Sequence, residues 1–152
     1  LEQTYMVRLL LPAESNLKKR LVKAPKVYLR DSGLLHALRD IASYDELIAH
    51  PLNGASWEGF VIENLVTSHP RWTPSYARTS NGAEVDLIME RGRRRVVIEC
   101  KLTKAPIPSR GFHQLVADLH PEAAWLAAPV DEAYDIQAGI RAGHLQHIRL
   151  DD

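Results

Sequence analysis

The chain has 152 residues, enough for one domain with a hydrophobic core but not comfortably for two. Hydrophobic residues make up 45% and charged residues 25%, a composition that excludes a disordered chain. The formal net charge is zero, so no overall electrostatic field draws the chain to nucleic acid or to a membrane. A single cysteine, Cys100, excludes a disulfide framework and a cysteine-based zinc site. No apolar run approaches the ~20 residues that span a bilayer, and no signal-peptide pattern appears. The single cysteine fits a reducing compartment, so we expect a cytoplasmic protein.

The first fifty residues predict two short strands followed by short helical turns. An apolar run that ends at Pro12 predicts the first strand, and KVYL at 26–29 predicts the second. Asp31 and Ser32 can cap a short leucine-rich helix, and a further turn is expected at 45–50. Because the sequence begins at Leu1 without a starting methionine, we expect a fragment of a longer polypeptide.

A basic run lies between the two predicted strands. It consists of Lys18, Lys19, Arg20 and Lys23. We interpret it as a solvated loop in preference to a phosphate-binding patch, because runs of like charge are usually hydrated.

The stretch NGASWEGFVIENLVTSH, residues 53–69, predicts the clearest helix, which ends before Pro70. At about 100° per residue, Glu58 falls in the middle of the apolar arc and Glu63 points away from it. A carboxylate on the core-facing side is costly unless it is paired or coordinates a metal. The alternative is an acid that favours the helix macrodipole and reaches solvent. We favour a functional role for Glu58.

After a short strand at 75–79, the stretch EVDLIMERGRRRVVIECK, residues 84–101, predicts a β-hairpin. With a two-residue loop at Gly92 and Arg93, Leu87 faces Ile98 and Met89 faces Val96, which gives one apolar face. Strict alternation places Val85, Leu87 and Met89 together and Glu84, Asp86, Ile88 and Glu90 on the opposite face.

On the polar face of this hairpin, the register predicts three opposed pairs. They are Asp86 with Glu99, Glu84 with Lys101, and Glu90 with Arg95. Two opposed carboxylates lie roughly 5 Å apart and destabilise a sheet unless something offsets their repulsion. A divalent cation would offset it.

The remainder of the chain completes an α/β pattern. Ser109 can cap a helix at 110–119, and residues 123–128 suit a buried strand. We expect a helix at 134–142 and a last strand at 145–150. The central order is therefore helix, three strands, helix, strand.

Three acids and a lysine are candidates for one site. Glu58, Asp86 and Glu99 offer oxygen ligands of the kind that suits Mg²⁺ or Mn²⁺. Such a metal polarises a phosphodiester and activates water, and Lys101 could position the water or stabilise developing charge. The arginines of the turn, Arg91, Arg93 and Arg94, could contact a nucleic-acid backbone or form a solvated edge.

These residues resemble the PD-(D/E)XK nuclease superfamily, whose restriction-endonuclease-like core has the same order of elements. Asp86, the twelve residues 87–98 and then Glu99-Cys100-Lys101 match its motif. The resemblance implies a catalytic role for Asp86, Glu99 and Lys101, and for Glu58 as the helix acid. It also implies a supporting role for Gln114. Glu84, which faces Lys101 in the predicted register, would support the metal ligands and would not itself be a ligand. Val85 replaces the proline of the motif.

A closer resemblance covers nearly the whole chain and rests on three blocks. They are KRLVKAPKVYLRDSGLL, GASWEGFVIENL and RTSNGAEVDLIMERGRRRVVIECK. They resemble the C-terminal domain of unknown function of prokaryotic AAA-type ATPases. The resemblance implies an extension at 1–52 that connects to an upstream ATPase region, and a nuclease-like domain at 53–152. No Walker A motif occurs, so we expect no ATP site within these residues.

Three functions remain open from the sequence. The first is Mg²⁺-dependent phosphodiester hydrolysis on DNA. The second is a non-catalytic module that binds nucleic acid or protein and regulates the ATPase. The third is a structural or oligomerisation domain whose acids are satisfied by ion pairs, including Glu84–Lys101 and Glu90–Arg95.

Overall fold

The computed structural model describes residues 2–14 and 21–150 and has a mixed α/β fold, as predicted. No helix within these residues is both long and apolar enough to cross a membrane. The helices are α1 (Ser32–Leu38), α2 (Tyr44–Ala49), α3 (Asn53–Ser68), α4 (Arg110–Leu119) and the 3₁₀ turn η1 (Leu145–His147). The strands are β1 (Val7–Leu10), β2 (Lys26–Leu29), β3 (Thr73–Arg78), β4 (Glu84–Arg91), β5 (Arg94–Cys100), β6 (Ala123–Ala127), β7 (Tyr134–Gln137) and β8 (Ile140–Gly143).

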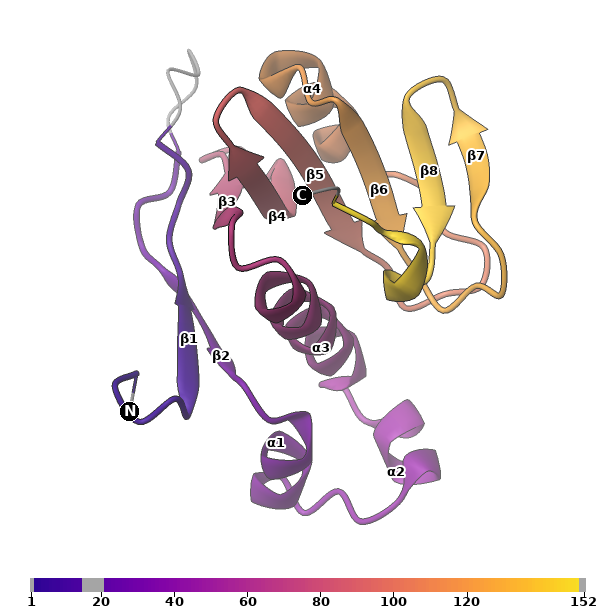
Figure 1. Cartoon of the computed structure of the whole chain (residues 1–152). Helices are drawn as coiled ribbons and strands as arrows, with labels where there is room; N and C mark the ends of the chain where they lie inside the picture. Colours follow the sequence, from indigo (N-terminus) through magenta and orange to yellow (C-terminus); the bar gives the residue numbers. More distant parts are fainter. Residues whose placement is uncertain (1, 15–20, 151–152) are drawn as a thin grey trace.

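The main sheet has the strand order β3-β4-β5-β6-β8-β7 and is covered on both faces (Figure 1). β3, β4 and β5 are antiparallel neighbours, whereas β6 runs parallel to β5 and to β8. One core cluster joins α3 to Leu87, Met89, Val96 and Ile98. A second cluster joins α4 to the opposite face of the same strands. The predicted order helix, three strands, helix, strand is the observed order of α3 to β6.

The hairpin register is confirmed. Leu87 pairs with Ile98, Met89 with Val96 and Arg91 with Arg94, across a turn in which Gly92 has a φ of 61°. A positive φ is a conformation that glycine adopts without steric cost, so Gly92 fixes the two-residue loop.

Strict alternation along β4 is wrong at its beginning, because β4 contains a bulge. Ser75 pairs with Ile88 and Ala77 pairs with Val85. An advance of two residues along β3 is therefore matched by an advance of three residues along β4, which contains one extra residue. Val85 therefore packs on the α4 side with Ile88, whereas Leu87 stays on the α3 side. Because of the bulge, Asp86 does not follow the strict alternation that predicts it on the same face as Ile88.

The N-terminal part forms a separate layer. β1 and β2 pair as an antiparallel two-stranded sheet, and both were predicted. Asp31 caps α1 by accepting the N–H of Leu34, also as predicted, and Ser43 caps α2 in the same way. Most of the basic run, residues 18–20, lies outside the described residues.

The predicted C-terminal helix and last strand are wrong. Residues 134–143 form the β7–β8 hairpin, which turns at Gly139 with a φ of 80°, and residues 145–147 form η1. The apolar pair Ile136 and Ile140 has helical spacing, but both side chains belong to the core on the α4 side. Pairing of β8 with the buried strand β6 overrides the local helical pattern.

Two glycines at the second position of a helix provide a matched test of packing. A Cβ on Gly111 of α4 would lie 2.7 Å from the Ala83 Cα, whereas a Cβ on Gly54 of α3 would meet nothing within 4 Å. We expect Gly111→Ala to lower the free energy of unfolding by about 1–3 kcal/mol, because backbone must move. Gly54→Ala should raise it by about 0.5–1 kcal/mol. Urea denaturation measures both, and equal effects would contradict the close α4–β4 contact.

Candidate functional site

The best-defined polar site is a lysine surrounded by three carboxylates. The Lys26 ammonium of β2 lies 2.6 Å from Glu84 Oε1, 2.9 Å from Glu58 Oε1 and 3.4 Å from Asp86 Oδ1. We call Glu58, Glu84 and Asp86 the acid cluster. The Lys26 side chain is only 13% exposed, so the ammonium has exchanged most of its hydration for these oxygens.

Two further hydrogen bonds hold the acid cluster in place. The Tyr28 hydroxyl donates to Glu58 Oε1 at 2.5 Å, and the Cys100 backbone N–H donates to Asp86 Oδ2 at 2.8 Å. The second bond spans the point where β4 and β5 separate, beyond the Leu87–Ile98 pair. Asp86 thus takes the backbone donor that a continued strand ladder would have used.

Burial and like charge shift the ionisation of this site. Desolvation, followed by the neighbouring Glu58, raises the pKa of Asp86 to about 6. Burial alone would lower the pKa of Lys26, but its bonds to Glu84 and Glu58 outweigh burial and raise it. Burial and then Glu58 raise the pKa of Tyr28, so its hydroxyl stays a donor at neutral pH.

Each member of the site comes from an element whose local sequence explains its position. Glu58 lies on the inner arc of α3, as its helical phase predicted. Alternation along β2 puts Lys26, Tyr28 and Arg30 on the face that meets α3, where Arg30 bonds Glu63 at 2.7 Å. The bulge in β4 directs Asp86 toward the same place.

The structure does not bring Glu99 into this cluster. Glu99 Oε1 pairs with the Lys101 ammonium at 3.0 Å, and its Oε2 accepts the N–H of Ser109, the N-cap of α4, at 3.2 Å. Alternation along β5 places Glu99 on the side of Val97, which packs on α4. The sequence-predicted residues therefore form two pairs, Glu58 with Asp86 and Glu99 with Lys101.

As arranged, these residues do not fit a shared divalent ion. Within residues 2–14 and 21–150, no three His, Cys, Asp or Glu side chains are placed to hold one metal. Mg²⁺ needs several oxygen ligands at about 2.0–2.2 Å, and an ammonium already lies among the three closest acids. The predicted metal-binding role of Glu58, Asp86 and Glu99 stays a prediction.

Among the supporting residues, the Glu84–Lys101 ion pair is wrong. Glu84 bonds Lys26 instead, and its other oxygen lies 3.3 Å from Arg78, without hydrogen-bond geometry. The bulge explains this, because it shifts Glu84 out of the simple hairpin register. The Glu90–Arg95 pair is confirmed at 2.6 Å. Gln114 is exposed on α4, and its supporting role stays a prediction.

The arginines of the hairpin turn contact neighbouring elements. Arg94 pairs with Glu122 at 2.9 Å and stacks over the Trp72 ring, while Arg93 is exposed and Arg91 half-buried. Their contact with nucleic acid stays a prediction.

The site roles of Lys26 and Tyr28 were not predicted from the sequence. A signal for them exists, since KVYLR alternates polar with apolar residues and so predicts a face carrying Lys26, Tyr28 and Arg30. Nothing local indicates that this face meets α3.

Comparison with known proteins places the chain in a family without an assigned function. Residues 53–148 match the family described as domain of unknown function DUF4143. The chain belongs to this family. Residues 1–45 match a second domain of unknown function, DUF8612.

Two mycobacterial proteins are similar to most of the chain. They are the uncharacterized proteins Rv2008c of Mycobacterium tuberculosis and Mb2031c of Mycobacterium bovis, each 40% identical over 119 residues. The match covers 78% of this chain but 27% of each relative. The chain thus spans about a quarter of the length of the curated relatives it matches.

The raised pKa of Asp86 predicts a pH dependence of stability. Since the folded-state pKa of about 6 exceeds the ordinary 3.8, the folded chain binds this proton more readily, and Asp86 costs stability above pH 6. Relative to wild type, Asp86→Asn should gain about 2 kcal/mol of unfolding free energy as pH rises from about 4.5 to about 7.5.

Urea denaturation across this range measures the difference. Asp135→Asn is the matched control, because that side chain is 77% exposed, and its difference from wild type should stay constant. A constant difference for Asp86→Asn as well would contradict the crowding of negative charge around Asp86.

Proposed function

We propose that this chain is a non-catalytic, partner-binding module of a longer polypeptide. The observation that carries the proposal is the Lys26 ammonium within bonding distance of all three members of the acid cluster. A cationic side chain thereby occupies the place where a metal-dependent enzyme would need its ion. The lysine is covalently part of the chain, so no external cation is needed to offset these charges.

The energetics of such a cluster favour a fixed internal partner. Removing one member of a buried ion pair typically costs about 3–5 kcal/mol, because the other charge is left uncompensated. Lys26 bonds all three carboxylates, with Asp86 the most distant at 3.4 Å, so its displacement by a hydrated ion is opposed by several interactions at once. Tyr28 additionally occupies a lone pair on Glu58 that a metal would use.

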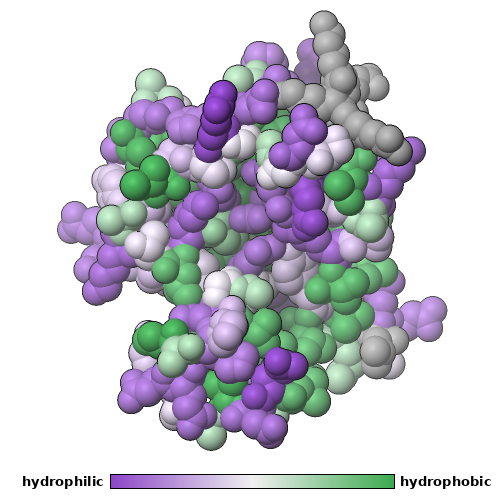
Figure 2. Space-filling model, turned by 180° about the vertical axis from the view of Figure 1, so that it is seen from behind, coloured by the Kyte–Doolittle hydropathy of each residue, from purple (hydrophilic) through white to green (hydrophobic). Residues whose placement is uncertain are grey.

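Exposed apolar surface in the N-terminal layer supports partner binding. Among the described residues, eight large hydrophobic side chains exposed to solvent lie between Tyr5 and Phe60, and three lie beyond. Figure 2 shows hydrophobic residues, interspersed with polar ones, over the lower half of the molecule, which carries α1 and α2. Contiguous exposed apolar surface is typical of protein interaction sites.

A groove of about 260 Å³ lies within this apolar surface, between β2, α1 and α3. Val27 at its edge is 62% exposed, and Leu35, Leu52 and Phe60 contribute apolar walls. The groove borders β2, the strand that delivers Lys26 to the acid cluster.

We propose that the partner is the ATPase region of the same polypeptide. The resemblance to C-terminal domains of prokaryotic AAA-type ATPases supports this, and the relatives are long enough to contain such a region. On this proposal the core is restriction-endonuclease-like, residues 53–152 form the nuclease-like domain, residues 1–52 connect it to the ATPase, and the protein is cytoplasmic.

A second candidate is Mg²⁺- or Mn²⁺-dependent phosphodiester hydrolysis on DNA. Its support is the excess of negative charge at the site, where three carboxylates face Lys26 and Arg78 and the pKa of Asp86 is raised to about 6. This candidate requires Lys26 and Glu99 to exchange their present partners.

The two candidates predict opposite responses to metal. For a non-catalytic module, Mn²⁺ or Mg²⁺ should leave the melting temperature of the wild-type chain unchanged, and DNA cleavage should not exceed background. Lys26→Met should lower the free energy of unfolding by about 3 kcal/mol, because it leaves the buried negative charges of the acid cluster without their cation. Lys23→Met, at an exposed lysine three residues earlier, is the matched control and should have no effect.

Thermal denaturation with and without metal, combined with a plasmid cleavage assay, separates the outcomes. A wild-type melting temperature that rises with Mn²⁺ and no longer rises in Asp86→Ala would support the second candidate. Cleavage lost in Glu99→Ala and Lys101→Ala would establish it and overturn the proposal.

A further inference from the structure

A set of arginines gathers at the edge of the main sheet where the parallel strands begin. We call it the arginine strip, and it consists of Arg71, Arg91, Arg93, Arg94 and Arg141. Arg94 and Arg141 are the first and second residues of β5 and β8, which flank β6. In register, Arg141 is level with Trp125 of β6 and with Ile98 of β5, so it lies two strands across the sheet and four residues along β5 from Arg94.

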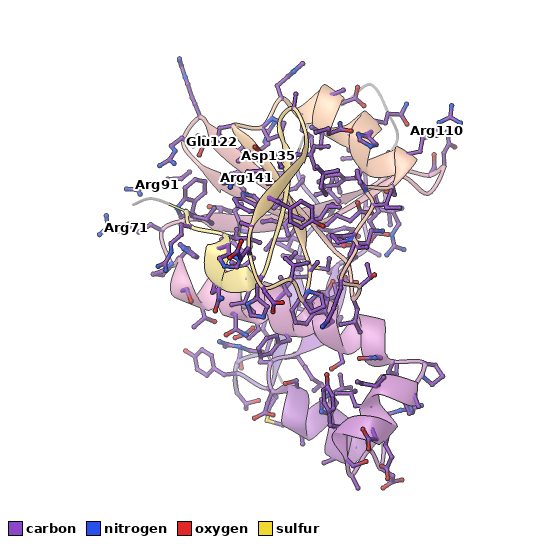
Figure 3. The ribbon with its side chains drawn as sticks, turned by 90° about the vertical axis from the view of Figure 1, so that its right-hand side faces the viewer. Arg71, Arg91, Arg110, Glu122, Asp135 and Arg141 are labelled. Atoms are coloured by element: carbon purple, nitrogen blue, oxygen red, sulfur yellow. The ribbon has the colours of Figure 1, made fainter. Side chains whose placement is uncertain are left out.

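Contacts link the members of the strip across four segments. Arg91 pairs with Arg94 in the hairpin register, and Arg94 stacks over Trp72, which follows Arg71. Arg94 also pairs with Glu122, which lines one hollow of about 270 Å³ together with Arg141. In Figure 3, Arg71, Arg91 and Arg141 lie toward one side of the molecule, and Arg110 lies at the opposite edge.

Two buried tryptophans hold the central guanidinium groups in position. The Arg94 guanidinium carbon lies 5.0 Å from the Trp72 ring centroid, and that of Arg141 lies 4.8 Å from the Trp125 ring centroid. Both rings are almost fully buried, so each forms a rigid floor beneath its arginine. A guanidinium stacked on an indole keeps its in-plane N–H donors available for oxygen acceptors.

The carboxylates in the strip are weak competitors for these donors. Glu122 pairs with Arg94 and Asp135 pairs with Arg141 at 2.9 Å, but Asp135 is 77% exposed and Glu122 is 38% exposed. Exposed ion pairs contribute only about 0–1 kcal/mol, so an external polyanion can replace them. The five arginines of the strip outnumber the two carboxylates that pair with Arg94 and Arg141, on a chain whose formal charge is zero.

We infer that the arginine strip binds the phosphate backbone of a nucleic acid. Arginine forks match phosphate oxygens bidentately, and a row of them from several strands follows a chain of repeated charges better than a single small anion. The tryptophans are covered by the arginines, so they are not platforms for stacked bases. Binding should therefore depend on backbone charge with little preference for sequence.

This inference does not depend on the acid cluster. Arg91, Arg93 and Arg94 lie at the turn where β5 begins, whereas Asp86 bonds Cys100, where β5 ends. A nucleic acid could thus be held without being cut.

Fluorescence anisotropy of labelled single-stranded and duplex DNA tests the inference. Affinity should fall steeply as salt rises from about 50 to about 200 mM, with similar values for unrelated sequences. Each of Arg94→Gln and Arg141→Gln should weaken binding and lower the slope of log affinity against log salt by about 1. Glu122→Gln and Asp135→Asn should tighten binding, because they remove the competing carboxylates.

Arg110→Gln is the matched control, since Arg110 is exposed on the far side of the molecule and should leave binding unchanged. Melting temperatures of all variants exclude unfolding as the cause, and Arg94→Lys should retain part of the affinity. Absence of binding, or equal losses in Arg110→Gln and Arg141→Gln, would overturn the inference. Binding only to vesicles of anionic lipid, lost in the same variants, would also overturn it and assign the strip to a membrane surface.

Discussion

The arrangement of this domain depends on one buried cation. The Lys26 ammonium joins β2 of the N-terminal layer to Glu58 of α3 and to Glu84 and Asp86 of β4. In a second set of ion pairs between the N-terminal layer and α3, Arg8 and Arg30 both bond Glu63, which lies on the next turn of α3 after Glu58. These ion pairs fix the two-stranded sheet against the helix that covers the main sheet. The N-terminal layer is therefore an electrostatic part of the domain core and not a loosely attached extension.

Local rules predicted the elements that local interactions determine. The two-residue turn at Gly92 fixed the hairpin register, and side-chain caps at Asp31 and Ser109 fixed the starts of two helices. The site was predictable only in part. Helical phase identified Glu58, but no local pattern predicts the bulge that turns Asp86 away from Glu99, or the pairing of β8 with β6 that replaced a predicted helix.

Lys26 shows why motif spacing is an incomplete guide to chemistry. The residues Asp86, Glu99 and Lys101 have the spacing of a nuclease motif, yet Asp86 bonds the Cys100 N–H and Lys26, whereas Glu99 and Lys101 bond each other. The residue that neutralises Glu58 and Asp86 is about 30 and 60 positions away in sequence. On these proposals, the apolar groove beside β2 would bind a protein region and the arginine strip would bind a nucleic acid at the same time. A non-catalytic module with both surfaces would connect the two.

The most direct test is a crystal structure of the chain grown with Mn²⁺, with anomalous scattering used to locate the metal. If Lys26 is the permanent cation of the acid cluster, its Nζ will lie within hydrogen-bonding distance of Glu58 and Glu84, and no manganese peak will appear among the three carboxylates. A manganese peak bonded to Asp86 and Glu58, with the Lys26 side chain displaced, would contradict this and show that the site belongs to a metal.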